Sequence, residues 1–358
     1  MSSGTAQANP ADPAAGPSNG PAPAAAAAGR ESTLRRLAGS PLLRLIARRV
    51  LIAIPLLLAV SILTFILLEA MPGDPARNQA GMDATAAEVE AVRQRMGLDR
   101  PAPERYLSWL GGFVTGDLGQ SSVSGQPVTT LLAQRLPVTL ELVGLAFVVS
   151  FVVSLPVALL AARRPGGLVD KAVMVMSMTL LAIPNFVMAI LLVLVFAVVL
   201  RLLPAIGYVP LGEGLIPNLR SVILPVLALG IPIACFYARF LRGDLVEQLK
   251  SADYVDTARA KGAGPWRVLW LHAFRNSSFG LLTLVGLNVG GLIGGTVIIE
   301  QIYAMPGMGM LMLQAVGSLD TAVVQICVFI FAAVAVFANL FVDVMYAVLD
   351  PRIRYGSH

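Results

Sequence analysis

The chain has 358 residues, of which 56% are hydrophobic and 13% are charged, and its formal net charge is +5. A mean hydropathy of +0.76 excludes an ordinary soluble domain and indicates a polytopic membrane protein. The basic residues are scattered among short segments that flank apolar runs, so membrane topology explains the positive charge better than nucleic-acid binding does.

The first 40 residues are rich in Ala, Pro, Gly and Ser and have no periodic apolar face. Such a segment cannot bury enough apolar surface to fold, so residues 1–40 are predicted to form a disordered cytoplasmic extension. A secretory signal is the alternative. The alanine run at 24–28 is short, weakly apolar and not preceded by positive charge, and we therefore favour the extension.

A first transmembrane helix is predicted over 41–70. The apolar run at 50–68 is long enough to cross a bilayer, and Arg44, Arg48 and Arg49 precede it. Because arginine is enriched on the inner side of membranes, the N-terminal end of this helix is expected in the cytoplasm.

Residues 71–135 are predicted to form an extracytoplasmic cap. The segment opens with a Pro-Gly-Asp-Pro turn, and the spacing of Val89, Val92 and Met96 predicts an amphipathic helix over 84–96. As a soluble loop, the cap could simply pack the outer end of a helix bundle.

Apolar runs over 139–162, 172–200 and 221–240 predict the second, third and fourth transmembrane helices. Pro184 interrupts the third run, and we interpret it as a kink rather than as a ligand contact. The segment 201–220 is rich in Gly and Pro and is predicted to be an outer loop.

The fifth transmembrane helix is predicted over 277–299. Gly286, Gly290 and Gly294 recur at every fourth position, which allows two helix backbones to approach closely. We favour helix packing over a pore-lining role for these glycines.

Three polar residues of the same region are candidates for the translocation path: Asn288, Glu300 and Gln301. Such groups are costly in lipid and are therefore expected to face protein or water. The glycines and the proline within 300–311 predict a short re-entrant or interfacial turn after the helix.

The last transmembrane helix is predicted over 321–349, which completes a core of 136–349. Asn339 and Asp343 lie one turn apart on one face of this helix, where the acid could relay ions or pair with a basic group. The tail 350–358 returns to the cytoplasm, so six spans place both termini inside.

A polar stretch at 237–276 separates the fourth and fifth spans, and its excess of basic residues places it in the cytoplasm. Apolar residues recur at three- and four-residue steps on both sides of Gly262 and Gly264, and Pro265 suits the first turn of a second helix. The pattern predicts a surface helix–turn–helix over about 244–275. Its apolar face needs a partner to cover it.

The centre of this hairpin resembles a known motif. Asp256-Thr257-Ala258, followed by Gly262, resembles the Glu-Ala-Ala-x-x-x-Gly loop of the permease subunits of ATP-binding-cassette importers. Asp256 replaces the Glu of the family pattern and Thr257 replaces its first Ala. The His-Ala-Phe-Arg-Asn ending at 272–276 is similar to that of the oligopeptide and dipeptide branch.

Other segments extend the resemblance over about 43–355. They are the Pro-Gly-Asp-Pro turn, the Leu-Leu-Ala-Ile-Pro-Asn-Phe run, the Pro-Gly-Met-Gly segment at 306–309 and the Asn-x-x-x-Asp run that ends at Asp343. They occur in the order of the family and on the expected faces. Because the family shares the last run, it favours structural pairing of Asp343 with a basic group.

The resemblance implies an all-α type I importer permease fold with six transmembrane helices, a cap between helices 1 and 2 and a coupling hairpin between helices 4 and 5. The residues implied in coupling to an ATPase are Asp256, Thr257, Ala258, Gly262, Gly264 and Pro265. The implied partners are a second homologous permease, two ATPase domains and an extracytoplasmic solute-binding protein that the cap would receive.

The resemblance implies import of dipeptides or oligopeptides, and relatives that carry nickel, haem or glutathione remain alternatives. An autonomous secondary carrier is disfavoured, because carriers place ionisable residues near the membrane midplane and have no use for a long inner hairpin.

The sequence holds no Gly-x-x-x-x-Gly-Lys-Ser/Thr phosphate loop, so ATP and Mg²⁺ are expected on partner ATPases. His272 and His358 are the only histidines, which argues against a histidine metal site. Cys235 and Cys327 fall in opposite leaflets, too far apart for a disulfide. We therefore expect a non-catalytic subunit of the bacterial inner membrane, without a cofactor or nucleic-acid partner of its own.

Overall fold

The computed structural model describes residues 41–81 and 83–349, so the predicted N-terminal extension 1–40 and the tail 350–358 lie outside the described residues. The chain divides into two units, 1–48 and 49–358, and the description below concerns the second. Every regular element among the described residues is helical, apart from one isolated bridge between Gln120 and Pro127. The all-α prediction is confirmed.

The first long helix, α2 (Pro41–Glu69), is apolar on nearly every side, and 6% of its most apolar 18-residue window is buried. Such a helix is suited to contact lipid over most of its surface. In its N-terminal half the guanidinium of Arg49 makes two contacts with Asp343, with Nε 2.8 Å from Oδ2. The predicted pairing of Asp343 with a basic group is confirmed.

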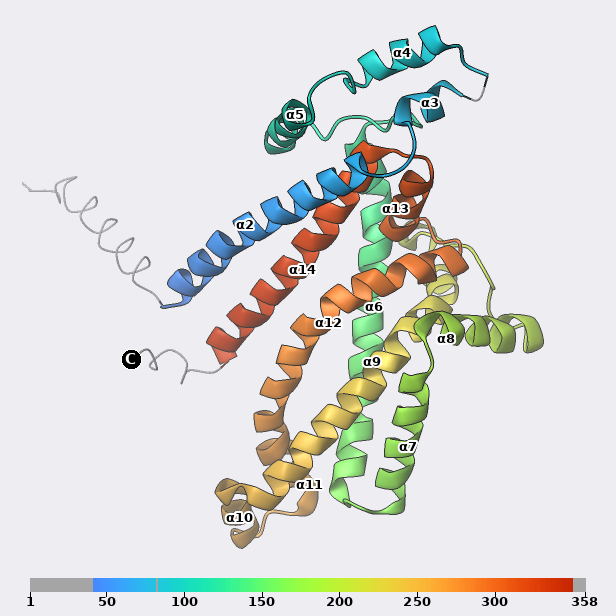
Figure 1. Cartoon of the computed structure of the whole chain (residues 1–358). Coiled ribbons are helices and arrows are strands. Elements are labelled where there is room, and N and C mark those ends of the chain that lie inside the picture. Colours follow the sequence, from blue (N-terminus) through green and yellow to red (C-terminus); the bar gives the residue numbers. More distant parts are fainter. Residues whose placement is uncertain (1–40, 82, 350–358) are drawn as a thin grey trace, which may run out of the picture. The chain divides into compact units, whose positions relative to one another are not determined.

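The cap contains three short helices, α3 (Pro75–Ala80), α4 (Ala86–Arg95) and α5 (Ala102–Thr115), which Figure 1 shows beyond one end of the long helices. The predicted amphipathic helix is α4, and it starts at a capping box in which Thr85 and Glu88 bond each other's backbone. Arg93 of α4 pairs with Asp74, which caps α3. The next helix begins at Val128, within the range 71–135 that was predicted for the cap.

Two long helices, α6 (Val128–Arg163) and α9 (Leu215–Ser251), pack side by side and form the centre of the core. Leu142 of α6 and Leu224 and Leu229 of α9 are almost fully buried. Helix α9 extends beyond the predicted fourth span 221–240 at both ends.

The extra length of α9 has a physical reason. Leu241 and Leu245 lie beyond the predicted end and are completely buried against Ala158 and Leu159 of α6. Burying each leucine contributes on the order of 1.5–3 kcal/mol, which favours continuation of the helix beyond its predicted end.

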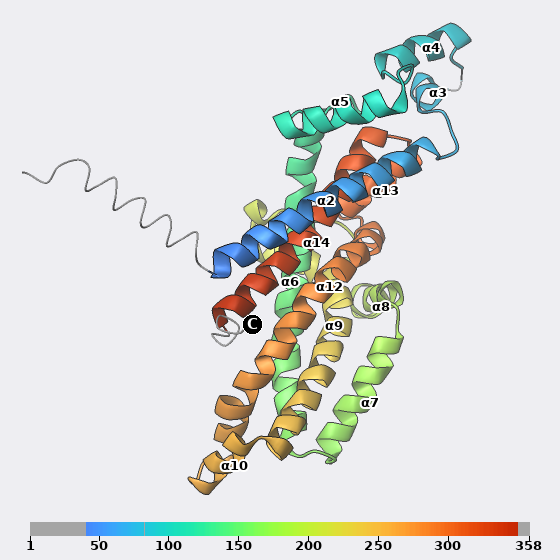
Figure 2. The same ribbon diagram turned by 60° about the vertical axis from the view of Figure 1, so that its left-hand side comes forward.

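The predicted third span is replaced by two helices. α7 (Leu168–Ala182) and α8 (Asn185–Leu192, continued by the π-helix η1 at Val193–Val199) meet at an angle of 100°. Ile183 is extended because the ring of Pro184 disfavours the helical conformation of the residue before it. Figure 2 shows α7 and α8 pointing in different directions. Among the described residues, five helices can cross a membrane, or six if this pair counts as one span.

The last part of the fold is α12 (Phe274–Ile302), α13 (Met308–Gly317) and α14 (Thr321–Leu349). The predicted turn after α12 is present, with Ala304 at φ +51°, and it leads into α13, a short apolar helix that was not predicted. Cys235 is half-buried, Cys327 is buried, and neither forms a disulfide.

Candidate functional site

The hairpin between α9 and α12 is the candidate site, and we call residues 244–275 the docking hairpin. It consists of the end of α9, then α10 (Asp253–Ala260), α11 (Pro265–Arg267) and the π-helix η3 (Val268–Ala273). Figure 1 shows α10 and α11 at the end of α9 that is remote from the cap. The six predicted coupling residues all lie within it.

The docking hairpin contains a break that was not predicted, at Ala252. Its extended backbone separates α9 from α10, although its N–H still donates to the carbonyl of Gln248 at 3.2 Å. Asp253 and Asp256 then occupy the first turn of α10. Their negative charges interact favourably with the partial positive charge of the helix N-terminus.

Gly262 ends α10 as predicted. Its φ of +79° lies in the left-handed region, its N–H donates to the carbonyl of Arg259 at 2.9 Å, and the N–H of Ala263 donates to that of Ala258 at 3.1 Å. These two bonds form a Schellman motif, which satisfies carbonyls at the end of a helix. Gly264 has φ −66° and ψ 158°, the extended conformation expected before Pro265.

The docking hairpin has a small core of its own. Val255 and Ala258 of α10 and Val268 of η3 are buried together. The methyl group of Ala258 occupies little space, so α10 can approach η3 closely. Thr257, one residue earlier, is exposed to solvent and is not part of this core.

The outer surface of the docking hairpin mixes charges with exposed aromatic rings. Asp256 is exposed and pairs with Arg259 at 3.2 Å, three residues along the same helix. Trp266 is 44% exposed and Trp270 is 54% exposed, and the guanidinium of Arg163 lies 5.0 Å from the ring centroid of Trp266. Exposed aromatic rings beside charged groups are typical of a protein–protein contact.

The docking hairpin is held to the long helices by side-chain bonds. The side-chain oxygen Oε1 of Gln248 accepts from the hydroxyl of Tyr254 at 2.6 Å and from the side-chain amide of Asn276 at 3.0 Å. These bonds connect α9, α10 and α12. Burial raises the pKa of Tyr254 above its ordinary value, so at neutral pH its hydroxyl stays protonated and can donate.

Of the three translocation-path candidates, Asn288 lies apart from the adjacent Glu300 and Gln301. Asn288 and Glu300 are separated by 12 positions on α12, about 18 Å along a helix. The half-buried Asn288 donates to the carbonyl of Leu284 at 2.7 Å, and Gln301 is exposed.

Glu300 is completely buried inside this chain, and its role in the translocation path stays a prediction. Its Oε1 accepts from the hydroxyl of Thr139 at 2.6 Å and its Oε2 accepts from the N–H of Met310 at 2.9 Å. The hydroxyl of Thr139 also accepts from the N–H of Met308 at 2.8 Å. Glu300 therefore anchors the start of α13 to α6 and α12.

The three packing glycines of α12 have different surroundings. A Cβ at Gly286 would stand 3.1 Å from Asn339 and Val342 of α14, so this glycine allows a close approach of two helices. No neighbouring atom lies within 4 Å of the equivalent point at Gly290 or Gly294, and both are exposed. Among the residues that the structure describes, no side chain or backbone therefore packs closely against those two positions.

Two contacts that position the docking hairpin were missed from the sequence. They are the contact of Arg163 with Trp266 and the ion pair of Asp170 with Arg242. An acid at the first turn of an apolar helix could have indicated Asp170, but its partner lies 72 positions away. In the part of the chain that the structure describes, no three His, Cys, Asp or Glu side chains gather as a metal site would require.

Comparisons with known proteins identify the family of the chain. Residues 154–355 match the family described as binding-protein-dependent transport system inner membrane component, and residues 42–143 match the N-terminal model of the same systems. A putative peptide transport system permease of Brucella abortus is 40% identical over 87% of this chain and 99% of its own length.

Two further relatives have different names. The oligopeptide transport system permease protein AppB of Bacillus subtilis is 36% identical over 87% of this chain and 99% of its own. The glutathione transport system permease protein GsiC of Pectobacterium atrosepticum is 36% identical over 86% of this chain and 98% of its own. A chain of the MetNI methionine ABC transporter, solved facing inward, has a TM-score of 0.47 and 18% identity, over 62% of this chain and 96% of that one.

The family models together cover most of the chain, and the relatives match it almost from end to end. The chain therefore belongs to the family of multi-pass inner-membrane permease components of binding-protein-dependent transport systems.

Proposed function

We propose that the chain forms one half of the translocation path of an ATP-driven importer for dipeptides or oligopeptides. Both termini would lie in the cytoplasm. Relatives that match nearly the whole chain are named as peptide and oligopeptide permeases, and this supports the substrate class. The relative named for glutathione, itself a tripeptide, keeps glutathione as a candidate within that class.

The docking hairpin carries the proposal. It combines a core of its own, an exposed surface of charges and aromatic rings, and direct bonds to α9 and α12. Since the sequence has no phosphate loop, ATP and Mg²⁺ would be bound by a partner ATPase, and this chain would be a non-catalytic subunit without a cofactor. The surface suits a helix-in-groove contact with that ATPase.

Movement would pass from the ATPase to the membrane through the same bonds. Because Gln248 holds both α10 and α12, displacement of the docking hairpin would tilt α9 and α12 together. Such rigid-body motion is a known form of alternating access. Two ATPase domains would drive two hairpins, one on each permease.

The second permease would cover the exposed stripe on α12. Gly290, Gly291 and Gly294 are exposed, and Leu287 beside them is 70% exposed. Small residues favour the close approach of a second helix in lipid. On the outer side, the cap would receive the solute-binding protein.

Reconstitution tests the proposal. The chain is placed in lipid vesicles with the second permease, the two ATPases and the solute-binding protein, and uptake of a labelled dipeptide is followed. We expect uptake only when ATP and all components are present. Accumulation driven by an ion gradient in vesicles without the ATPases would overturn the proposal and favour an autonomous carrier.

A further inference from the structure

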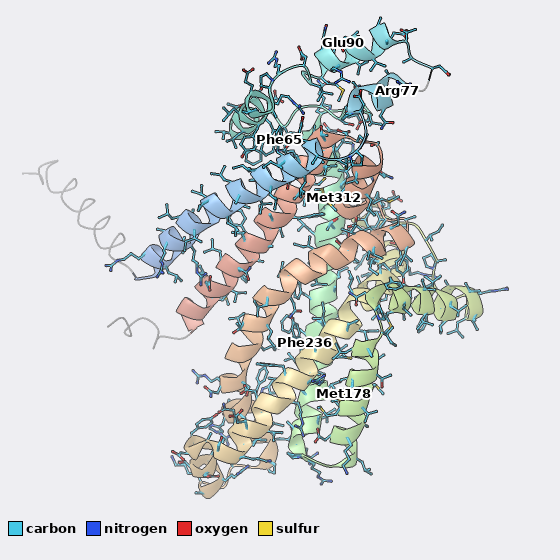
Figure 3. The ribbon with its side chains drawn as sticks, in the orientation of Figure 1. Phe65, Arg77, Glu90, Met178, Phe236 and Met312 are labelled. Carbon is cyan, nitrogen blue, oxygen red and sulfur yellow. The ribbon has the colours of Figure 1, made fainter. Side chains whose placement is uncertain are left out.

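A second site lies in the cap, away from the docking hairpin. A partly open cavity of about 570 Å³ is lined by residues of α2, α3, α4, α5, the segments 96–100 and 117–125 and the start of α14. Figure 3 labels Phe65, one of its lining residues, at the end of α2 next to the cap. The volume falls within the roughly 300–1,000 Å³ that is typical of small-molecule pockets.

The charged groups of the cavity are mostly basic. Arg95, Arg100 and Arg105 line it, and Asp117 is the acid among its lining residues. Arg105 is already paired, with Nη2 3.0 Å from a carboxylate oxygen of Glu69. Arg95 and Arg100 have no ion-pair partner within 4 Å among the residues that the structure describes, so the cavity favours an anion.

Two further donors at the cavity are unused. The Nε1 of Trp109 and the Nε2 of Gln325 are buried and have no hydrogen-bond partner among the residues that the structure describes, and Gln325 is 4% exposed. Leaving a buried donor unpaired is unfavourable. A bound group with acceptor oxygens could remove that cost.

The cavity also has an aromatic wall, formed by Phe65 and Trp109. The ring of Trp109 is in turn packed against two rings that do not line the cavity, because it stacks on Phe113 at 5.8 Å between centroids and meets Phe329 of α14 edge-on at 6.4 Å. Aromatic faces accept apolar side chains of many shapes. The site therefore offers cationic and neutral donors on one side and an apolar surface on another.

We propose that this cavity binds the terminal carboxylate of a short peptide. A carboxylate matches the two-pronged geometry of a guanidinium and supplies acceptors for the unpaired N–H groups, while the aromatic wall would hold a neighbouring side chain. The choice of a peptide rests on the proposed function. The carboxylate chemistry rests on the donors of the cavity alone.

Calorimetric titration of the full chain in lipid nanodiscs tests the site. The probes are Ala-Phe-Ala with a free carboxylate, the same tripeptide with a C-terminal amide, and inorganic phosphate. The test variant is Arg95→Gln with Arg100→Gln. The control is Arg77→Gln, because Arg77 is an exposed arginine of α3 that does not line the cavity (Figure 3).

We expect the free acid to bind saturably and the amide to bind at least about tenfold more weakly, since each charge-assisted bond contributes roughly 1.5–3 kcal/mol. The double variant should weaken the free acid by a similar factor, and Arg77→Gln should not. Trp109→Phe, which keeps an aromatic ring but removes the indole N–H, should weaken binding of the free acid several-fold.

Three results would overturn the site: equal binding of acid and amide, unchanged binding by the double variant, or a phosphate response equal to that of the peptide. Each of them leaves ATP-dependent uptake untouched, so the proposed function could stand while this site fell. Binding of the free acid without ATP-dependent uptake would support the site and contradict the proposed function.

Discussion

Arg242 of α9 grips Asp170 of α7 through two nitrogens, with its Nε 2.7 Å from Oδ1 and its Nη2 bonded to Oδ2. The Asp170 side chain is 4% exposed, and its Oδ2 also accepts from the N–H of Gly166 at 2.7 Å. The pair joins the α6–α7 turn, α7 and α9 just before the docking hairpin begins. It fixes the base from which the hairpin projects.

Replacing Arg242 by Ala should destabilise the protein strongly. A buried carboxylate left without its partner typically costs about 3–5 kcal/mol. We expect a lower thermal unfolding temperature of the purified protein, with partial recovery when Asp170→Asn is added to Arg242→Ala. The control is Arg239→Ala, which removes an exposed arginine from the same helix. Equal losses from Arg242→Ala and Arg239→Ala would show that the pair contributes little.

The backbone of Gly262 gives a prediction about coupling. Valine at this position would occupy the left-handed region at about 1–2 kcal/mol, although no atom within 4 Å obstructs its Cβ. Gly262→Val should therefore distort the end of α10 and reduce ATP-dependent uptake. Gly264→Val is the matched control, because Gly264 has an extended backbone that valine adopts readily and is also unobstructed.

The two valine variants are compared in vesicles that contain the complete transporter. We expect Gly262→Val to retain ATPase activity that is no longer linked to uptake. Gly264→Val adds the same side chain to the coupling segment without backbone strain, and it should therefore keep more of the uptake. Uptake lowered equally by the two substitutions would argue against a role for the left-handed turn.

Reversing the charge of Asp256 should weaken docking without unfolding the docking hairpin. Asp256 is exposed, and its surface pair with Arg259 is worth about 0–1 kcal/mol at most. We expect Asp256→Arg to be as heat-stable as the parent and to lose most ATP-dependent uptake. Arg259→Gln removes the same ion pair from its other side and is the control. If both variants transport alike, the carboxylate is not part of the docking surface.

Local chemistry explains which parts of the docking hairpin were predictable. Gly262 was identified as the stop of α10 because glycine enters the left-handed region without a steric penalty. The break at Ala252 had no such signal, because alanine favours helix and caps nothing. Only a kink was predicted at Pro184, where the two helices in fact meet at 100°. The apolar residues on both sides do not indicate the relative direction of the two helices.

Long-range partners set the other limit of sequence reasoning. The need of Asp343 for a basic partner was anticipated, but Arg49 lies 294 positions earlier and several arginines were equally available. Glu300 was placed on the translocation path because an acid in an apolar helix is costly. Its enclosure by Thr139 and the start of α13 depends on tertiary packing, to which periodicity within one helix is blind.

Two glycines of α13 test the anchor at Glu300. A Cβ at Gly309 would stand 2.6 Å from the Cα of Val297 and 3.0 Å from Oε2 of Glu300, so Gly309→Ala must displace backbone. Overpacking of this kind costs about 1–3 kcal/mol. Gly317→Ala, on the same helix, meets no atom within 4 Å and should be neutral. Thermal unfolding of the two alanine variants in detergent distinguishes them, and similar unfolding temperatures would contradict close packing at Gly309.

Tyr208 provides a prediction of pH dependence. Tyr208 lies in the chain segment between η1 and α9, and its hydroxyl donates to Glu141 of α6 at 2.7 Å. Asn218 donates to the other carboxylate oxygen of Glu141 at 2.7 Å. Burial, together with the bond to Glu141, raises the pKa of Tyr208 from 10.0 to about 12. A folded-state pKa above the unfolded value stabilises the fold below pH 10, and this contribution is lost as the pH rises from 10 to about 12.

The parent protein should therefore lose free energy of unfolding across that window, whereas Tyr208→Phe should change less because it has no proton to lose. Glu141→Gln is the control, since it removes the neighbouring negative charge but leaves the burial, and its loss should be smaller and should end at a lower pH than in the parent. The measurement is equilibrium unfolding in detergent at pH 9 to 12. Parallel pH profiles for the parent and Tyr208→Phe would show that another group governs alkaline unfolding.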